Sequence, residues 1–336
     1  MGGINTSEPQ PAARRNPVLS DASVFITGGA GFIGSTLAGQ LADSNSLTLY
    51  DNFARDAISD TPLARHPNVR IVRGDILDPA ALQAAMAGHT HVVHCAAIAG
   101  IDTVTKSPVT TMRVNMMGSA NVLEAANALD ACQRVVCFST SEVFGQRAFR
   151  VSETDNTVMG AVGEPRWTYA VSKLAEEHLA IAYHSEFGLP VAVVRPFNVY
   201  GPGQVGEGAM RIFIERALRN EPIQIHGDGS QIRSWCYVDD MVRSVMIALE
   251  HPNAVGESFN IGNPRAVATM TGLAQAVVRV TNSSSQISFV HRGGVDVELR
   301  VPKIDKARDL IGFEAEVDLD EGIERTAAWI GRRAAG

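Results

Sequence analysis

Cysteine is scarce in this sequence, with four in 336 residues, and no two of them have the C-x-x-C spacing. This scarcity excludes a disulfide framework and gives no pattern typical of a metal site. We therefore expect free thiols, a cytoplasmic location and no metal. An uninterrupted apolar run of about 18 residues is also missing, so no membrane-spanning helix is predicted.

Basic residues are in the minority, with 29 Lys and Arg against 36 Asp and Glu and a formal net charge of −7. Binding to nucleic acid or to an anionic membrane needs clustered cations, so we expect neither partner. The segment 1–21 contains prolines but no hydrophobic segment behind its arginine pair, which predicts a disordered tail and not a signal peptide. The chain as a whole is 45% hydrophobic, enough for a large core.

From residue 22 onward, short β-branched runs alternate with longer amphipathic stretches. Such alternation predicts an α/β fold with a Rossmann-type, doubly wound parallel sheet, because each parallel crossover needs a covering helix. We expect residues 22–200 to form this Rossmann-type domain and residues 201–336 to form mainly a smaller α/β substrate-binding cap, interleaved with it. The expected strands are 23–28, 46–51, 69–73, 91–96, 134–139 and 191–196, and the main expected helices are 33–43, 79–86, 109–128 and 167–187.

A glycine-rich segment, Thr27–Gly34, follows the first expected strand and opens the first expected helix. Glycines there allow a tight turn and a close approach to a pyrophosphate, which the helix N-terminus binds. Asp51 closes the second strand roughly 20 residues later, where a carboxylate accepts from a ribose 2′-hydroxyl and repels a 2′-phosphate. NAD is therefore predicted in preference to NADP, the alternative being that Asp51 only caps the next turn. The expected cofactor contacts are Gly28, Gly31, Phe32, Ile33, Gly34, Asp51, Asn52, Asp75, Ile76, Ala96, Ala97, Asn115, Tyr169 and Lys173.

Several separate motifs resemble the extended short-chain dehydrogenase/reductase family, whose members act on nucleotide-linked sugars. The resemblance runs from Val24 to about Ile330 and implies a homodimer packed through segments 109–128 and 167–187. The motifs are the G-x-x-G-x-x-G loop, His94–Ala97, Asn115, Ser139–Gly145, Tyr169–Lys173, Arg195–Gly203 and Gly227–Gly229.

Tyr169 and Lys173 are four residues apart in an expected helix and so project from one face. An ammonium and a nicotinamide ring nearby would favour the phenolate of a tyrosine that is otherwise a poor base at neutral pH. Thr140, at the end of the fifth expected strand, can hydrogen-bond the same substrate oxygen. In the resembled family this trio removes the proton of the sugar 4-hydroxyl while hydride leaves C4 for NAD. Taken alone, a Y-x-x-x-K pair more often marks a solvated helix face.

Three further features resemble the nucleotide-sugar decarboxylases of the family, namely the UDP-glucuronate decarboxylases and their lipid A-modifying relatives. They are Thr140-Ser141-Glu142, the Pro-Arg-Trp approach to Tyr169 in 163–169, and Arg300 in 295–302. A 4-keto hexuronate loses CO2 to leave an enolate, so its enzyme needs a cation near the carboxylate and an acid at C5. The resemblance assigns Arg300 to the first role and Glu142 and Ser141 to the second. A purely structural role for Glu142, and a pyrophosphate or surface role for Arg300, are the alternatives.

Residues expected to hold the nucleotide sugar follow the sixth strand. Asn198 can offer its amide to a phosphate oxygen, and Arg233 matches a family arginine that pairs with the diphosphate. The backbone of Gln224 and Ile225 resembles a stretch that reads the nucleobase. A capping or surface role is the alternative for Arg233.

The predicted activity is NAD-dependent oxidation at C4 of UDP-glucuronate with decarboxylation, which gives a UDP-4-keto-pentose, UDP-xylose after hydride return, or both. A nucleotide-sugar 4-epimerase or 4,6-dehydratase would use the same trio and is the first alternative. A non-catalytic NAD-binding sensor is a remote one, because such proteins typically lose the tyrosine or the lysine.

Overall fold

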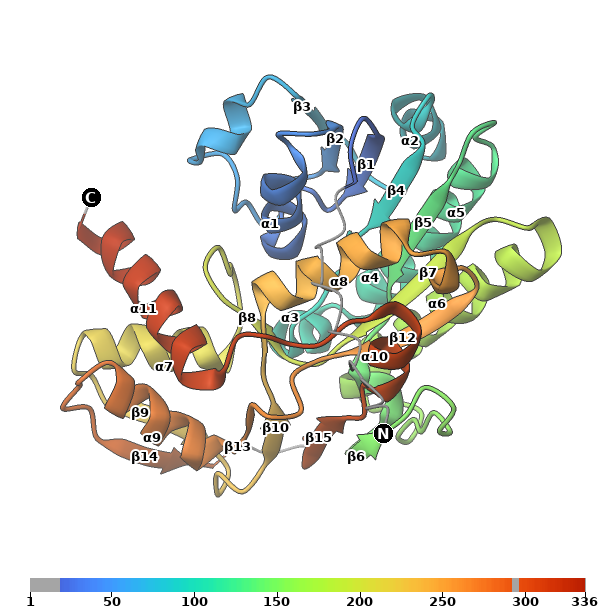
Figure 1. The fold of residues 1–336 in the computed structure, drawn as a ribbon. Coiled ribbons are helices and arrows are strands. Elements are labelled where there is room, and N and C mark those ends of the chain that lie inside the picture. The colour runs from blue at the N-terminus through green and yellow to red at the C-terminus, as the bar shows by residue number, and fades with distance from the viewer. Residues whose placement is uncertain (1–18, 292–295, 336) are drawn as a thin grey trace, which may run out of the picture.

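The computed structural model describes residues 19–291 and 296–335. Within them lies a seven-stranded sheet whose neighbouring strands all pair in parallel, in the order β12-β7-β5-β4-β1-β2-β3 (Figure 1). The predicted α/β fold with a Rossmann-type sheet is confirmed, and each of the six expected strands is present. The strands are β1 (Ser23–Thr27), β2 (Ser46–Asp51), β3 (Val69–Arg73), β4 (His91–His94), β5 (Arg134–Phe138), β7 (Val191–Pro196) and β12 (Glu257–Ile261).

Helices cover both faces of this sheet, which is why its central strands are almost continuously apolar. Val24 and Ile26 of β1 pack into the same cluster as residues of α1 (Phe32–Leu41) and α8 (Val238–Glu250). Phe25, between them, points to the other face, toward α2 (Pro79–Met86), α5 (Ser119–Asn127) and α6 (Thr168–Phe187). Because all the strands run in parallel, their carboxyl ends lie at one edge of the sheet, between the two helical layers.

The long helix expected over 109–128 is interrupted. It consists of α4 (Pro108–Met112), a π-helical segment η2 (Arg113–Gly118) and α5. Apolar spacing in the sequence does not reveal such a segment, and π turns occur frequently at functional sites. Here the π turn contains Asn115, which is fully buried.

A second, smaller part of the molecule lies beside the carboxyl ends of β5 and β7, and Figure 1 shows it below the large sheet. It contains the four-stranded sheet β13-β10-β15-β6 and the pair β14-β9. β6, in this smaller part, comes from before residue 200. β12 and α8 come from after residue 200 but belong to the large sheet and the helices that cover it. The chain therefore crosses between the two parts more than once. The elements are β6 (Arg147–Val151), β9 (Ile223–His226), β10 (Ile232–Ser234), β13 (Val267–Thr269), β14 (Ile287–Val290), β15 (Leu299–Pro302), α7 (Ala209–Leu218), α9 (Met270–Val280) and α11 (Leu319–Ala335).

Shorter elements connect these parts. β8 (Val199–Tyr200) pairs with β11 (Cys236–Tyr237) directly after β7. Six further short helical segments of the described structure lie between the longer helices and strands. They are α3 (Ile101–Lys106), α10 (Asp305–Ile311), η1 (Pro62–Arg65), η3 (Ser141–Phe144), η4 (Pro165–Trp167) and η5 (Pro252–Ala254).

The expected disordered tail, residues 1–21, is only partly within the described structure, since residues 1–18 lie outside it. The end of that segment is already folded. Asp21 donates its backbone N–H to the carbonyl of Ser44 at 2.8 Å, and the Asn45 amide donates to the carbonyl of Leu19 at 2.8 Å. The fold therefore begins before residue 22, because these bonds join residues 19–21 to the loop before β2.

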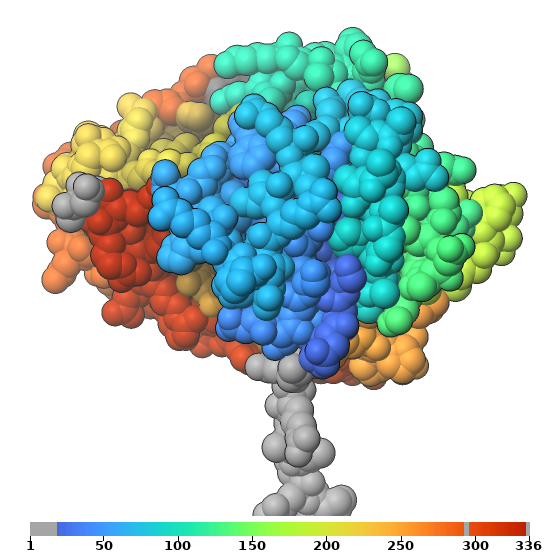
Figure 2. Space-filling model, turned by 90° about the horizontal axis from the view of Figure 1, so that it is seen from above, coloured from blue at the N-terminus to red at the C-terminus, as the bar shows by residue number. Residues whose placement is uncertain are grey.

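The C-terminal helix α11 joins the two halves of the chain. Figure 2 shows its red residues beside light-blue residues of the N-terminal half. Arg333 of α11 forms an ion pair with Asp60 at 3.8 Å, between the loop that follows β2 and the end of the chain. The ion pair is exposed to solvent, so it marks where α11 lies beside the Rossmann-type layer and contributes little to holding it there.

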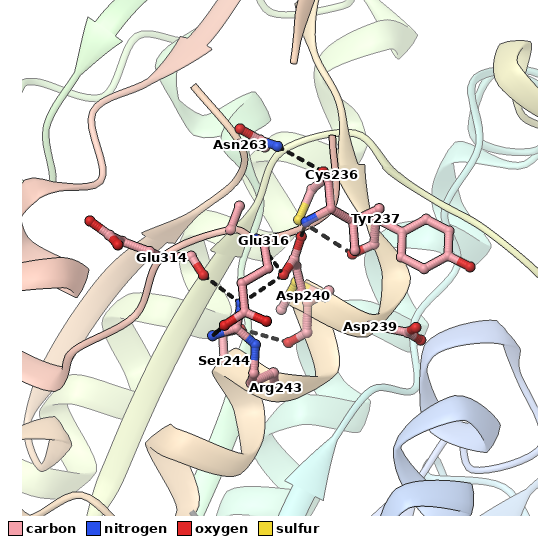
Figure 3. Close-up of polar contacts among 12 residues, drawn as sticks. Cys236, Tyr237, Asp239, Asp240, Arg243, Ser244, Asn263, Glu314 and Glu316 are labelled. Carbon is pink, nitrogen blue, oxygen red and sulfur yellow. Dashed lines mark hydrogen bonds and ion pairs between the residues drawn. The ribbon is translucent and has the colours of Figure 1, made fainter. Parts of the chain in front are cut away.

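A buried carboxylate fixes the segment that leads into α11 (Figure 3). Asp240 of α8 is 1% exposed and accepts the backbone N–H groups of Glu316 at 2.8 Å and Val317 at 3.0 Å. It also accepts from Arg243 at 2.7 Å, one turn later on the same helix. Three donors therefore depend on one side chain. The neighbouring Asp239 points away from them and is about half exposed.

We expect Asp240→Ala to lower the free energy of unfolding by about 2–4 kcal/mol, because it leaves two backbone N–H groups without an acceptor. It also removes one carboxylate from Arg243, which keeps its contacts with Glu314 and Glu316. Asp239→Ala is the matched control on the same helix and should cost less than about 1 kcal/mol, since its ion pair with Arg325 is exposed to solvent. Urea denaturation followed by circular dichroism measures both. Equal losses for the two variants would show that Asp240 does not hold this segment.

Candidate active site

A cavity of about 600 Å³ lies at the carboxyl ends of β5 and β7, between the large sheet and the smaller part. Its place follows from the fold, since ligands of doubly wound sheets bind in the crevice outside the strand carboxyl ends. Every predicted catalytic and substrate-binding residue lines it except Lys173. The lining includes Thr140, Ser141, Glu142, Tyr169, Asn198, Gln224, Ile225, Arg233 and Arg300.

Thr140 and Tyr169 meet in this cavity from two elements. Thr140 follows β5 and begins η3, where its hydroxyl accepts the backbone N–H of Glu142 at 3.2 Å. Tyr169 is the second residue of α6 and is hydrogen-bonded by the Thr140 side chain. Burial raises the pKa of Tyr169, the carboxylates of Glu142 and Glu176 raise it further, and the Thr140 bond and Arg300 only partly oppose them. The side chain is therefore a neutral phenol in this arrangement.

Lys173 does not face the cavity as the helical spacing led us to expect. It is buried, 1% exposed, and its Nζ forms an ion pair with Glu176 on the same helix. The largest influences on the pKa of Tyr169 are therefore burial and the carboxylates of Glu142 and Glu176, which raise it, and not the paired ammonium of Lys173. Sequence reasoning missed Glu176, although an acid three residues after a lysine in a helix is a sequence-visible signal. Burial raises the pKa of Glu176, and the charge of Lys173 offsets part of that rise.

Glu142 is held between two arginines. Its Oε2 is 2.7 Å from Nη1 of Arg166 and its Oε1 is 3.2 Å from Nη2, a two-point ion pair. Nη1 of Arg300 is 3.5 Å from Oε1. Burial raises the pKa of Glu142, but the charges of Arg300 and Arg166 outweigh it and lower the pKa overall. Glu142 is therefore a carboxylate in this state, and Arg166 is the contact that sequence reasoning did not assign.

Arg300 is the more deeply buried of the two arginines, at 3% exposed. Burial lowers the pKa of Arg300 to about 10, so the guanidinium keeps its charge at neutral pH. Its Nη2 donates to the carbonyl of Gly145 at 3.0 Å, which joins β15 to the end of η3. The position next to Glu142 and Tyr169, in the cavity, excludes the alternative that Arg300 is a surface residue.

Several buried polar atoms of the cavity lining have no hydrogen-bond partner among the described residues. Folded proteins satisfy nearly all such atoms, so these fit a polar ligand. They come from η4, β15, the loop after β8 and the residues on either side of β10. The atoms are Nε of Arg166, Nε of Arg300, Nε1 of Trp235, Oε1 of Gln204 and Oε1 of Gln231.

The predicted diphosphate contacts are already anchored by backbone. Arg233 donates to the carbonyls of Ile232 and Val297 and lies 3.7 Å from Asp296. Asn198, whose φ of +39° is unusual for a residue other than glycine, donates its amide to Ser234 at 2.7 Å. Both side chains line the cavity and are held in place before any ligand binds.

The glycine-rich turn fits the pyrophosphate of NAD. Gly28 has a φ of +68°, and a Cβ there would lie 2.7 Å from the backbone N of Ala96. A Cβ on Gly34 would lie 2.3 Å from the carbonyl of Gly28. Helix α1 begins after Gly31 with no acidic residue in its first turn and no side-chain cap, among the residues described. Its N-terminal N–H groups are thus available to an anion, as the sequence predicted.

Four predicted cofactor contacts lie at the ends of β2 and β3. Asp51 accepts from the backbone N–H groups of Ala30 at 2.9 Å and Phe53 at 2.7 Å, so the turn-capping role weighed for it is present. Asn52 and Asp75 each accept a backbone N–H two residues further on. Ile76 is buried and packs beside Gly118 of the π turn.

Asn115 is hydrogen-bonded within the protein. Its amide donates to the carbonyl of Ile98 and to Oγ of Ser172, both at 3.0 Å, and accepts the N–H of Ile98 at 2.8 Å. All of its polar atoms are occupied and none is exposed. The residue therefore holds the loop after Ala96 and Ala97 against α6, and its contact with the cofactor stays a prediction.

Two further searches covered the described ranges. No helix in them is both long and apolar enough to cross a membrane. No group of three or more His, Cys, Asp or Glu side chains in them could hold a metal ion.

Residues 24–262 match the model of a family described as the NAD dependent epimerase/dehydratase family. A UDP-N-acetyl-alpha-D-glucosaminuronate decarboxylase of Bacillus cytotoxicus is 34% identical over 91% of this chain and 96% of the relative. UDP-glucuronic acid decarboxylase 5 of Arabidopsis thaliana is 32% identical over 94% and 92%. The solved structure of UDP-glucuronic acid 4-epimerase from Bacillus cereus, in complex with UDP-glucuronic acid and NAD, has a TM-score of 0.82 and 29% identity over 93% and 99%.

The family match begins in β1 and ends just after β12, so it spans the large sheet and most of the cavity lining, while Met270, Asp296 and Arg300 lie beyond it. The predicted resemblance and the prediction of NAD as the cofactor are confirmed. The chain belongs to the NAD dependent epimerase/dehydratase family.

Proposed function

We propose that this protein is an NAD-dependent decarboxylase of a UDP-hexuronate, with UDP-glucuronate as the first candidate substrate. It oxidises C4 and releases C6 as CO2, which leaves a UDP-4-keto-pentose, or UDP-xylose when hydride returns to C4. The observation that carries this proposal is the buried pair Arg166 and Arg300 beside Thr140 and Tyr169. Two arginines there provide a binding site for a sugar carboxylate next to the groups that act on C4.

The first step belongs to Tyr169, Thr140 and Lys173. NAD supplies the hydride acceptor when it is bound. Tyr169 takes the proton of the 4-hydroxyl, and Thr140 orients that oxygen. Because the phenol is neutral and buried, it acts as a base only when positive charge next to it favours the phenolate, and Lys173 supplies such charge if it turns from Glu176.

The second step belongs to Arg300, Glu142 and Ser141. With a ketone at C4, the C5–C6 bond breaks, C6 leaves as CO2, and its bonding electrons remain as an enolate over C5, C4 and O4. Arg300 stabilises the carboxylate and then the developing negative charge. A proton delivered to C5 from Glu142 or Ser141 completes the ketone, and both side chains line the cavity next to Arg300.

The same cavity would also serve a 4-epimerase acting on a uronate, and a solved neighbour bears that name. The two activities differ in mass balance, because an epimerase keeps C6. The relatives' names also differ in the substituent at C2 of the sugar. UDP-glucuronate and UDP-N-acetylglucosaminuronate are therefore both to be tested as substrates.

A homodimer is the assembly that we propose. Apolar side chains are exposed on α4, η2 and α6, which pack against one another on one side of the large sheet. A second copy of the chain would cover them, as the extended family led us to expect. The side chains are Val109, Met116, Met117, Val171 and Phe187. The four cysteines are free, which favours the reducing cytoplasm as the proposed location.

Tyr169→Phe removes the proposed base without changing the ring, and we expect kcat for CO2 release from UDP-glucuronate to fall about 100-fold or more. The assay follows labelled CO2 from substrate carrying ¹³C at C6. Tyr183→Phe is the matched control on α6, where the hydroxyl donates only to Glu124, and should leave kcat unchanged. Unchanged turnover in Tyr169→Phe would reject this base, and full conversion of the wild type to UDP-galacturonate would reject the decarboxylase.

Glu142→Gln keeps the shape of the side chain but removes its acid function, so we expect kcat for CO2 release to fall about 100-fold. Binding of UDP should be unchanged, which shows that the cavity is intact. Glu298→Gln is the control, since that carboxylate is about half exposed and pairs with Arg147. Equal activities of the two variants would assign Glu142 a structural role only.

Purified wild-type chain should elute as a dimer in size-exclusion chromatography with light scattering. Met117→Glu places a charge in the exposed apolar patch and should give monomer, because burying an unpaired charge in an interface is unfavourable. Phe289→Glu changes an equally exposed residue on β14, away from this patch, and should leave the dimer intact. A monomeric wild type would reject the proposed assembly.

A further inference from the structure

Arg166 is built to bind a carboxylate on two sides. It lies on η4, three residues before Tyr169, and its side chain is 10% exposed and lines the cavity. Nη1 and Nη2 hold Glu142, while Nε has no hydrogen-bond partner within the described structure. The guanidinium also lies over the ring of Trp167, 5.8 Å from its centre, which fixes its plane. One edge of this buried cation is used and another is still available.

The charges around Glu142 leave one positive charge in excess. The groups that face it are Arg166 from η4, Arg300 from β15, Arg233 from β10 and Tyr169 from α6. Arg233 is paired with Asp296. Arg166 and Arg300 therefore share the single carboxylate of Glu142, and the excess charge lies on that pair. A monoanionic group entering the cavity between them would balance it.

We propose that Arg166 is a specificity-determining residue for the C6 carboxylate of the substrate, and that it exchanges Glu142 for this carboxylate when the substrate binds. This inference rests on the proposed function, because it takes a uronate as the ligand. The unpaired Nε of Arg166 forms a second two-point fork with Nη2, which Glu142 now occupies, so a carboxylate that binds this fork competes with Glu142 for Nη2. Glu142, released beside a second negative charge, takes up one proton from solution.

The exchange links binding to the proposed chemistry. When the C5–C6 bond breaks, C6 leaves as CO2, and the O–H bond of Glu142 breaks as its proton forms the new C5–H bond. Glu142 is then a carboxylate again, and Arg166 has lost its other partner. The two-point pair seen in the structure re-forms, and the site returns to its starting charge.

The first test measures binding to the full chain loaded with NAD and carrying Tyr169→Phe, which prevents turnover. Calorimetry compares UDP-glucuronate with UDP-glucose, which lacks the carboxylate. Adding Arg166→Gln should weaken binding of UDP-glucuronate about tenfold or more and leave UDP-glucose within about twofold, the effect of one charge-assisted bond pair. Arg166→Lys keeps the charge without the two-point geometry, so its affinity for UDP-glucuronate should lie between those of the unchanged residue and Arg166→Gln. Arg147→Gln, an exposed arginine paired with Glu298, is the control and should change neither.

The second test measures protons, a quantity that a purely structural role for Arg166 would not change. The same titrations in buffers of different ionisation heat give the protons taken up on binding. UDP-glucuronate should take up close to one proton at pH 7 and UDP-glucose none. Glu142→Gln should abolish the uptake. Equal proton uptake for the two sugars, or equal weakening of both by Arg166→Gln, would overturn the inference.

These outcomes are distinguishable from failure of the proposed function. If the wild type binds UDP-glucuronate more tightly than UDP-glucose through Arg166 but releases no CO2, the inference stands and the proposed decarboxylase activity is rejected. If the wild type releases CO2 and Arg166→Gln changes neither kcat nor KM for this reaction, the proposed decarboxylase activity stands and the inference is rejected. Retained UDP binding by Arg166→Gln shows that the variant is folded in either case.

Discussion

The ion pairs of Glu142 with Arg166 and Arg300 are the interaction on which the site depends. They join three elements that are distant in the sequence, η3 after β5, η4 before α6, and β15 of the smaller part. Isolated buried charges would be costly, so none of the three side chains could remain inside the cavity without the others. The cluster therefore both closes the two parts of the molecule onto each other and places positive charge where a sugar carboxylate would lie.

In the proposed mechanism, a second buried pair, Lys173 with Glu176, controls when Tyr169 can act as a base. Burial and two nearby carboxylates keep Tyr169 a neutral phenol. Its base function is thus conditional on positive charge brought close to it, which the bound cofactor and a reoriented Lys173 would supply. In this account the site is inactive until its ligands bind. The chain carries a net charge of −7, so the positive charge that the site needs comes from individual buried residues and from the cofactor.

The fold and the cofactor turn follow from the sequence because they depend on local patterns. Apolar runs of strand length give the large-sheet strands β1 to β5 and β7, and the glycines at 28 and 34 are required by backbone approaches that admit no Cβ. β12 was missed because it enters the sheet from the second half of the chain. The π turn at Asn115 and the contact of Arg166 with Glu142 depend on tertiary packing, which a single sequence does not display, whereas the spacing of Lys173 and Glu176 is visible in the sequence but was missed.

The most direct test of the central claim is a crystal structure of the protein with NAD and UDP-glucuronate, in the Tyr169→Phe variant so that the substrate is intact. The account predicts the C6 carboxylate within hydrogen-bonding distance of both Arg166 and Arg300, with Glu142 moved off Arg166 and the 4-hydroxyl at Thr140. A carboxylate that points to solvent, with Glu142 still held by Arg166, would contradict it.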